Sequence, residues 1–232
     1  MFEKFFGVEP AVISRSCIIL PSGDRGLFGP SGRNSSGMLA AVSESECGTL
    51  ISLKSRWVAG DAVLLLKDTP CENVALFGSC GSLEGPPPGK VLVSGAFNLE
   101  SFTGFLRDPA PGCIEYVEPP GELTGDFGRY CRDKDGDIIE GKCATVSSLM
   151  LEYEKLPALS ALGAGYVDME ASMVFSAAEY ACKSALGLFY VSDSPGRVDF
   201  YSPYGRDTAE KIKGSKKSLA LRLRDFLKSE RG

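Results

Sequence analysis

Short apolar runs rich in β-branched residues alternate with segments of helical periodicity along most of this chain. Each run has the composition of a buried strand, and the segments between runs leave room for crossover helices. The pattern therefore predicts an α/β domain with a parallel or mixed sheet. The expected strands are Ser16–Leu20, Met38–Val42, Thr49–Leu53, Val74–Phe77, Lys90–Ser94, Ile114–Val117, Lys142–Val146, Tyr166–Val167 and Leu188–Val191.

Three segments have the apolar spacing of helices that pack on a sheet: Arg56–Lys67, Glu170–Ala185 and Asp207–Lys228. The predicted buried face of Glu170–Ala185 is mostly alanine, so we expect this helix to lie close to the sheet. The glycine- and proline-rich stretches between elements are too short to be interdomain linkers. The 232 residues are therefore expected to form a single domain, residues 1–232.

The chain contains no histidine. This excludes Ser-His-Asp and Cys-His nucleophilic sites, His-ligated zinc and imidazole acid–base catalysis. Any catalysis must use carboxylates, Arg, Lys, Tyr, Ser or Cys, and we expect no metal and no cofactor. With 25 basic and 30 acidic side chains the formal charge is −5, which gives no electrostatic attraction to nucleic acid or anionic membranes.

The eight cysteines are widely spaced and form no C-x-x-C pair, which argues against a zinc ribbon or a thioredoxin-like motif. Most of them stand beside apolar residues, so we expect buried free thiols in a reducing compartment. No apolar stretch approaches the ~18 residues that a membrane helix needs. We therefore expect a cytoplasmic protein that does not bind membranes.

The stretch Gly78-Ser79-Cys80-Gly81 follows the expected strand Val74–Phe77. Small residues at the carboxyl end of a strand let a ligand approach the backbone, at the edge where open α/β sheets bind ligands. A plain exit from strand to turn is an equally good interpretation of these four residues.

Three short segments in the last two thirds of the chain carry recognisable motifs. They are V-A-L-F-G-S-C-G-S-L at 74–83, Y-V-D-M-E-A-S at 166–172 and F-Y-V-S-D at 189–193. They resemble the strand-plus-glycine segment, the V-x-M-E-[AS]-[AT] junction and the V-S-D strand end of the purine nucleoside phosphorylase and uridine phosphorylase superfamily, which includes the methylthioadenosine/S-adenosylhomocysteine nucleosidases. The resemblance extends from about Arg56 to the C-terminus. It implies a three-layer α/β/α sandwich with a twisted mixed sheet.

The resemblance also implies roles for particular side chains. Glu170 would accept hydrogen bonds from the ribose 2′ and 3′ hydroxyls, and Met169 would contact the sugar. Asp193 would donate a proton, or a hydrogen bond, to N7 of a departing purine, because an acid at that place stabilises the negative charge on the leaving base. Without a ligand, Glu170 would be an ordinary acid in a first helical turn, and Asp193 would cap the loop before Pro195.

The remaining cleft residues are also implied by the resemblance. The ligand would lie among Gly78-Ser79-Cys80-Gly81, Leu149-Met150, Met169-Glu170 and Ser192-Asp193. Leu149 or Met150 would cover the base in place of the family's aromatic residue. Arg206 stands where some family phosphorylases carry an Arg that moves the proton of the Asp toward the base; a surface Arg beside Asp207 is the alternative.

The chain departs from the family pattern at the site of the nucleophile. The nucleosidases activate water with an early Glu, and here Asp24 is the candidate, with a tight-turn Asp as the alternative. The phosphorylases hold phosphate with an Arg on the strand where this chain has Leu76. Arg25 or Arg56 would have to replace it.

These observations lead to one leading expectation about function. We expect an enzyme that cleaves the N-glycosidic bond of a purine-type nucleoside, with water as the preferred acceptor. The alternatives are a phosphate-dependent nucleoside phosphorylase and a nucleoside-binding relative without catalysis. The resemblance implies a homo-oligomer, in which a loop near Phe97, Phe102 and Phe105 would complete the neighbour's site.

Overall fold

The computed structural model describes residues 1–21, 24–29, 32–101, 113–134, 137–198 and 204–230. The strands are β1 Ser16–Leu20, β2 Asn34–Ser36, β3 Ala40–Ser45, β4 Gly48–Leu53, β5 Asn73–Ser82, β6 Lys90–Leu99, β7 Tyr116–Val117, β8 Ile139–Val146, β9 Tyr166–Asp168 and β10 Ser184–Asp193. The helices are α1 Phe2–Phe6, α2 Ala59–Leu65, α4 Leu123–Arg132, α5 Leu149–Ala161, α6 Ala171–Tyr180 and α7 Arg206–Ser229, with short 3-10 turns η1 Pro10–Val12, η2 Arg25–Phe28 and η3 Arg56–Val58.

The strands form one mixed sheet that is open at one end and closed at the other. β1 lies parallel to both β4 and β5, and β3 and β2 continue the open end. At the other end β10 lies between β5 and β6, β6 pairs with β8, β8 pairs with β9, and β9 pairs back with β5. The last pairing closes a ring of five strands, which brings the carboxyl ends of β5, β9 and β10 together.

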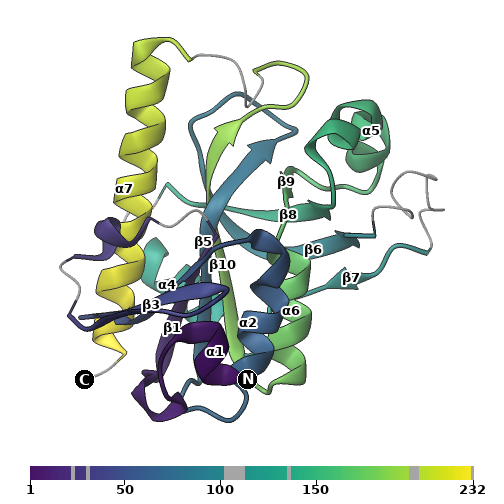
Figure 1. The fold of residues 1–232 in the computed structure, drawn as a ribbon. Helices are drawn as coiled ribbons and strands as arrows, with labels where there is room; N and C mark the ends of the chain where they lie inside the picture. Colours follow the sequence, from purple (N-terminus) through teal and green to yellow (C-terminus); the bar gives the residue numbers. More distant parts are fainter. Residues whose placement is uncertain (22–23, 30–31, 102–112, 135–136, 199–203, 231–232) are drawn as a thin grey trace.

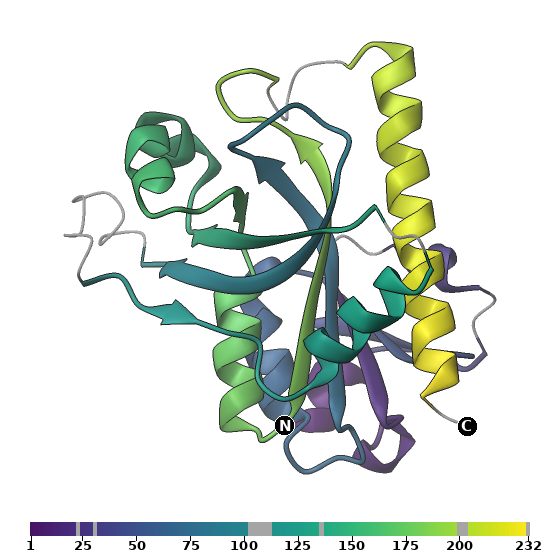
Figure 2. The ribbon, with the colours of Figure 1, turned by 180° about the vertical axis from the view of Figure 1, so that it is seen from behind.

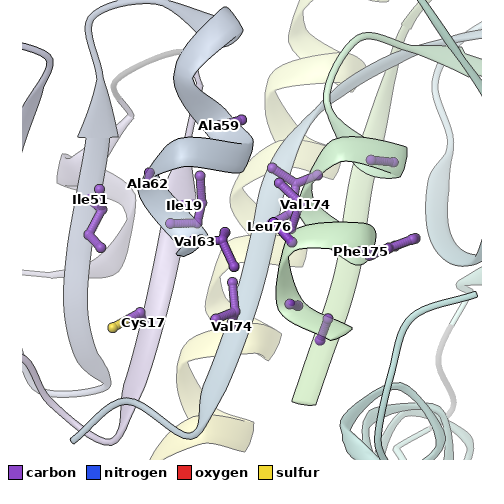
Figure 3. Packing of buried hydrophobic residues seen from close by; sticks show 14 of the residues in the cluster. Cys17, Ile19, Ile51, Ala59, Ala62, Val63, Val74, Leu76, Val174 and Phe175 are labelled. Atoms are coloured by element: carbon purple, nitrogen blue, oxygen red, sulfur yellow. The ribbon is translucent and has the colours of Figure 1, made fainter. Parts of the chain in front are cut away.

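Helices cover both faces of the sheet. Alternate residues of β1 and β5 belong to two separate cores: Ile19 and Leu76 pack under α2 and α6, whereas Ile18 and Phe77 pack under α4 and α7. Figures 1 and 2 show these two helical layers on opposite sides of the central strands. Figure 3 shows Leu76 on the α2–α6 side, close to Val174. The expected three-layer α/β/α sandwich with a mixed sheet is confirmed.

The structure corrects several expected boundaries. β5 continues through Gly78–Gly81 to Ser82, so these residues are not a turn. The helix expected to run to Ala185 ends at Tyr180, because the chain turns through Cys182 at a φ of 55° and begins β10 at Ser184.

Three helices, α1, α4 and α5, were not expected from the sequence. Leu149 and Met150, expected to cover the base, are the first two residues of α5, which contains Pro157. α4 contains Gly125 and Gly128. Glycine and proline weaken the helical signal in a sequence, yet tertiary packing keeps α4 and α5 helical.

The described helices include none long and apolar enough to cross a bilayer. All eight cysteines are free thiols; Cys113 and Cys182 are exposed, and the other six are buried as expected.

Candidate active site

The closed part of the sheet places three strands side by side at one point. Gly81 of β5 pairs with Val167 of β9 on one side and with Asp193 of β10 on the other. The register of β10 on β5 shifts between Val191 and Asp193, which is a β-bulge. In a regular strand neighbouring side chains face opposite ways, but after this bulge Ser192 and Asp193 both line the same pocket.

The glycines of β5 serve the packing of this junction. A Cβ atom on Gly81 would lie 3.2 Å from Oδ2 of Asp193 and 3.0 Å from Cδ of Pro195. The absence of a side chain at Gly81 therefore lets the Asp193 carboxyl lie against the β5 backbone. A Cβ on Gly78 would lie 3.2 Å from the ring of Phe189, so Gly78 makes room for the core and not for a ligand.

Asp168, the last residue of β9, holds the turn that presents Met169 and Glu170. Its Oδ2 accepts hydrogen bonds from the backbone N–H groups of Glu170 at 2.8 Å and Ala171 at 2.5 Å. Its Oδ1 accepts one from the hydroxyl of Thr145 at 2.8 Å, on the neighbouring strand β8. This network fixes the start of α6 and therefore the direction in which Glu170 enters the pocket.

The pocket has a volume of about 140 Å³. Its lining consists of Arg56, Ser79, Cys80, Gly81, Leu149, Glu152, Val167, Asp168, Met169, Glu170, Ser192 and Asp193. A larger hollow of about 530 Å³ lies beside α1 and β2, but the acidic side chains that line it, Glu3 and Glu9, are exposed. We therefore take the smaller pocket, with its buried acids, as the candidate site.

Burial dominates the electrostatics of the pocket. It raises the pKa of Glu170 to about 8, with a further contribution from the charge of Asp168, while the guanidinium of Arg56 acts in the opposite direction. Burial also raises the pKa of Asp168 to about 6, against the hydrogen bonds that stabilise its charged form. Desolvation thus outweighs the favourable effect that the start of a helix has on a charged Glu170.

Asp193 has a partner beside it in sequence. The hydroxyl of Ser192 donates to Oδ1 of Asp193 at 2.6 Å. The hydroxyl of Tyr204 in turn donates to the backbone carbonyl of Ser192, which ties the end of β10 to the approach to α7. The Asp193 side chain is buried and is therefore sheltered from bulk water.

Four pocket residues were not among the expected sugar, base or acid ligands: Arg56, Glu152, Val167 and Asp168. Glu152 lies in α5, which the sequence did not predict. Asp168 was visible only as the variable position of the V-x-M-E junction. Arg56 was considered only as a substitute phosphate ligand, and here its guanidinium lies against the sulfur of Met169.

Some expected residues are not brought to this pocket. Asp24 makes an ion pair with Lys216 of α7 at 2.5 Å, and Arg206 is exposed at the start of α7. Neither is among the described residues that line the pocket, and the same is true of Gly78 and of Met150, which is 73% exposed. The expected residues that do line the pocket are Ser79, Cys80, Gly81, Leu149, Met169, Glu170, Ser192 and Asp193.

Arg25 and Leu76, which were considered for the phosphate site, lie outside the described lining of the pocket. Arg25 donates a hydrogen bond to Ser43 at 3.0 Å and is not among the described residues of the pocket lining. Leu76 is completely buried in the core under α2 and α6. Phe97 packs on Tyr116, whereas Phe102 and Phe105 lie outside the described residues.

Comparison with known proteins adds to this geometry. The family model described as "Phosphorylase superfamily" matches residues 59–227. A search of curated proteins finds no match.

Solved structures share the fold at low sequence identity. A 5′-methylthioadenosine/S-adenosylhomocysteine nucleosidase from Campylobacter jejuni is 12% identical, with a TM-score of 0.70 over 94% of this chain and 99% of that chain. An AMP nucleosidase from Bacteroides thetaiotaomicron is 16% identical, with a TM-score of 0.68 over 99% and 95% of the two chains. A uridine phosphorylase from Vibrio fischeri is 13% identical, with a TM-score of 0.71 over 93% and 91%.

Proposed function

Because this chain belongs to the phosphorylase superfamily, we propose that it cleaves the N-glycosidic bond of a purine-type nucleoside, with water as the acceptor. The observation that carries the proposal is the meeting of Met169, Glu170, Ser192 and Asp193 in one pocket. Cleavage leaves negative charge on the base and positive charge on the sugar. The pocket offers a carboxyl group for each of these two charges.

The two carboxyl groups suit different parts of such a substrate. Glu170 stands beside Met169 at the start of α6, where the oxygens of an ionised carboxylate accept hydrogen bonds from two adjacent sugar hydroxyls. Asp193 follows the bulge of β10 and lies against the backbone of Gly81, where a buried acid suits a base that departs with negative charge. The pocket is smaller than the ~300–1,000 Å³ usual for a small-molecule site, so a whole nucleoside would extend beyond it.

The charges of the pocket favour water over phosphate. Glu152, Asp168, Glu170 and Asp193 line it together with a single described cation, Arg56. A phosphate dianion would be repelled by any of these acids that is ionised, and it would have one guanidinium as a partner. The presence of Arg56 is the observation that favours the second candidate, a phosphorylase.

The test is base release from a panel of purine and pyrimidine nucleosides, measured with and without phosphate. We expect release without phosphate, at a rate that added phosphate does not increase. The Arg56→Lys variant should leave the effect of phosphate unchanged, because no phosphate site is lost. Release that requires phosphate and disappears in Arg56→Lys would establish the phosphorylase. Binding without release would establish the non-catalytic relative.

We also propose that the chain forms a homo-oligomer. Most of the exposed large apolar side chains in the described part of the chain lie around two adjoining hollows of about 490 and 360 Å³. These side chains are Met1, Met38, Trp57, Leu64 and Tyr180. The face is formed by α1, α2 and α6, and Trp57 lies next to Arg56 of the pocket. A second copy on this face would bury the apolar side chains beside the candidate site.

Light scattering tests the oligomer. The wild-type protein should have a multiple of the mass of one chain at micromolar concentration, and Leu64→Glu should reduce it to one chain, since a charge at the junction of the two hollows cannot be buried without a partner. Ile139→Glu is the matched control, because Ile139 is exposed and apolar but lines neither hollow. A wild-type protein with the mass of one chain would contradict the proposal.

A further inference from the structure

The start of α6, which follows Glu170 of the pocket, is held by side chains from three strands. The first helical hydrogen bond of α6 runs from the N–H of Val174 to the carbonyl of Glu170 at 3.0 Å, so the N–H groups before Val174 need other acceptors. Asp168 of β9 accepts two of them, as described above. The hydroxyl of Thr145 on β8 accepts the N–H of Ser172 at 3.0 Å.

Glu100, the residue after β6, supplies the third acceptor. Its Oε1 accepts a hydrogen bond from the hydroxyl of Ser172, and its carboxyl group also accepts one from the backbone N–H of Met173. β6 lies parallel to β8, and β8 lies parallel to β9, so the carboxyl ends of all three strands meet at the start of α6. Each of these strand ends thus contributes one side chain to the first turn of the helix.

The position of Glu100 carries a cost that an ordinary helix cap avoids. The side chain is half-buried, and burial raises the pKa of its carboxyl, against the hydrogen bonds from Ser172 and Met173. A serine or asparagine at the helix start would cap it without placing a carboxyl inside the protein. The contribution of Glu100 from a distant strand therefore points to a role beyond capping.

Glu100 has no direct access to the substrate site. It is not among the described residues that line the pocket. The charges that act on Glu170 are those of Asp168 and Arg56, and that of Glu100 is not among them. Any influence of Glu100 on Glu170 must therefore pass through the position of the first turn of α6.

We propose that Glu100 is a positioning residue for Glu170: by holding the first turn of α6, it keeps the Glu170 carboxyl directed at the sugar. This inference rests on the proposed function. Hydrogen bonds connect the two residues, from Glu100 through Ser172, Thr145 and Asp168 to the backbone of Glu170. A shift of about 1 Å in this turn would be enough to spoil hydrogen bonds to two adjacent sugar hydroxyls.

The first test is a double-mutant cycle on base release. Glu100→Ala should lower kcat/KM by about 10- to 100-fold, because misplacing a binding group costs up to about that much. In the Glu170→Gln background the same replacement should lower it by no more than about twofold, since the carboxylate that Glu100 positions is already lost. A purely structural role would give the same fall in both backgrounds.

Two further variants control this cycle. Glu100→Gln should keep most of the wild-type kcat/KM, because the amide oxygen has two lone pairs and can accept from both Ser172 and Met173. Glu118→Ala should match the wild type, because Glu118 is exposed just after β7.

The second test needs no substrate. In protein labelled with ¹³C at the glutamate carboxyl carbons, the Glu170 signal should titrate at about pH 8, and Glu170→Gln identifies it. Glu100→Ala should move this signal down by at least about one pH unit, because a carboxyl released from its buried place regains water. The Glu152 signal, also expected at about pH 8, should stay in place. Glu100→Gln should move neither signal.

The outcomes separate the inference from the function on which it rests. An equal fall of kcat/KM in both backgrounds, or a Glu170 signal that Glu100→Ala does not move, would overturn the inference. Release from no nucleoside at all would reject the proposed function, and the Glu170 signal would then decide by itself whether Glu100 positions that carboxyl. If Glu100→Ala does not fold, Ser172→Ala removes the hydroxyl that Glu100 holds and takes its place in both tests, with the same expected directions.

Discussion

Replacing Asp193 by asparagine is expected to slow base release by roughly 10²–10⁴-fold, the range for loss of a general acid. The amide keeps the shape of the carboxyl group and can accept the hydrogen bond that Ser192 donates at 2.6 Å. It cannot pass a proton to the leaving base. Nucleoside affinity should therefore change little, because the variant loses an interaction that is made mainly in the transition state.

Release rates and isothermal titration on the same preparation test this prediction. Asp207→Asn is the matched control, since Asp207 is exposed in the first turn of α7 and should leave both quantities unchanged. An Asp193→Asn protein with wild-type turnover would show that another group protonates the base. A loss of affinity equal to the loss of rate would show that Asp193 serves binding.

Replacing Glu170 by glutamine is expected to weaken nucleoside binding by about 1.5–3 kcal/mol, the contribution of hydrogen bonds to a charged group. It should also slow cleavage, because the carboxylate stabilises positive charge on the sugar. The pKa of Glu170 is raised to about 8, so the carboxyl is neutral below that pH and charged above it. The difference in affinity between wild type and variant should therefore grow as the pH rises through about 8.

Isothermal titration between pH 6 and about 9 measures this difference. Glu179→Gln is the control, because Glu179 is exposed near the other end of α6. If Glu170→Gln binds as tightly as the wild type at high pH, the sugar must lie elsewhere. If the difference is the same at every pH, Glu170 acts through its shape and not through its charge.

The role of Asp168 shows how the site depends on contacts that a sequence does not reveal. A single-sequence motif places Glu170 after a strand and before a helix. The hydrogen bonds from Glu170 and Ala171 to Asp168, and from Thr145 on β8, determine where that turn points. Thr145 and Asp168 are opposite each other in the parallel pairing of β8 and β9, which depends on the closure of the sheet.

Local chemistry determined much of this protein from the sequence alone. β-Branched runs such as Ser16–Leu20 and Thr49–Leu53 formed strands, since a fully buried strand requires apolar residues on both faces. The Met169–Glu170 and Ser192–Asp193 pairs were recognised because the motifs around them resemble those of the nucleoside phosphorylase superfamily. The lack of histidine limited the chemistry before any fold was considered.

Only the tertiary structure decided which of these ends meet and what their environment does to them. The return of β9 to β5 set Val167 beside Gly81, and the bulge of β10 turned Asp193 into the pocket. Packing also kept α5 helical around Pro157 and so brought Glu152 into the pocket, while Asp24 was left in an ion pair with Lys216. Strand pairing and desolvation act between residues far apart in the chain, so no local pattern records them.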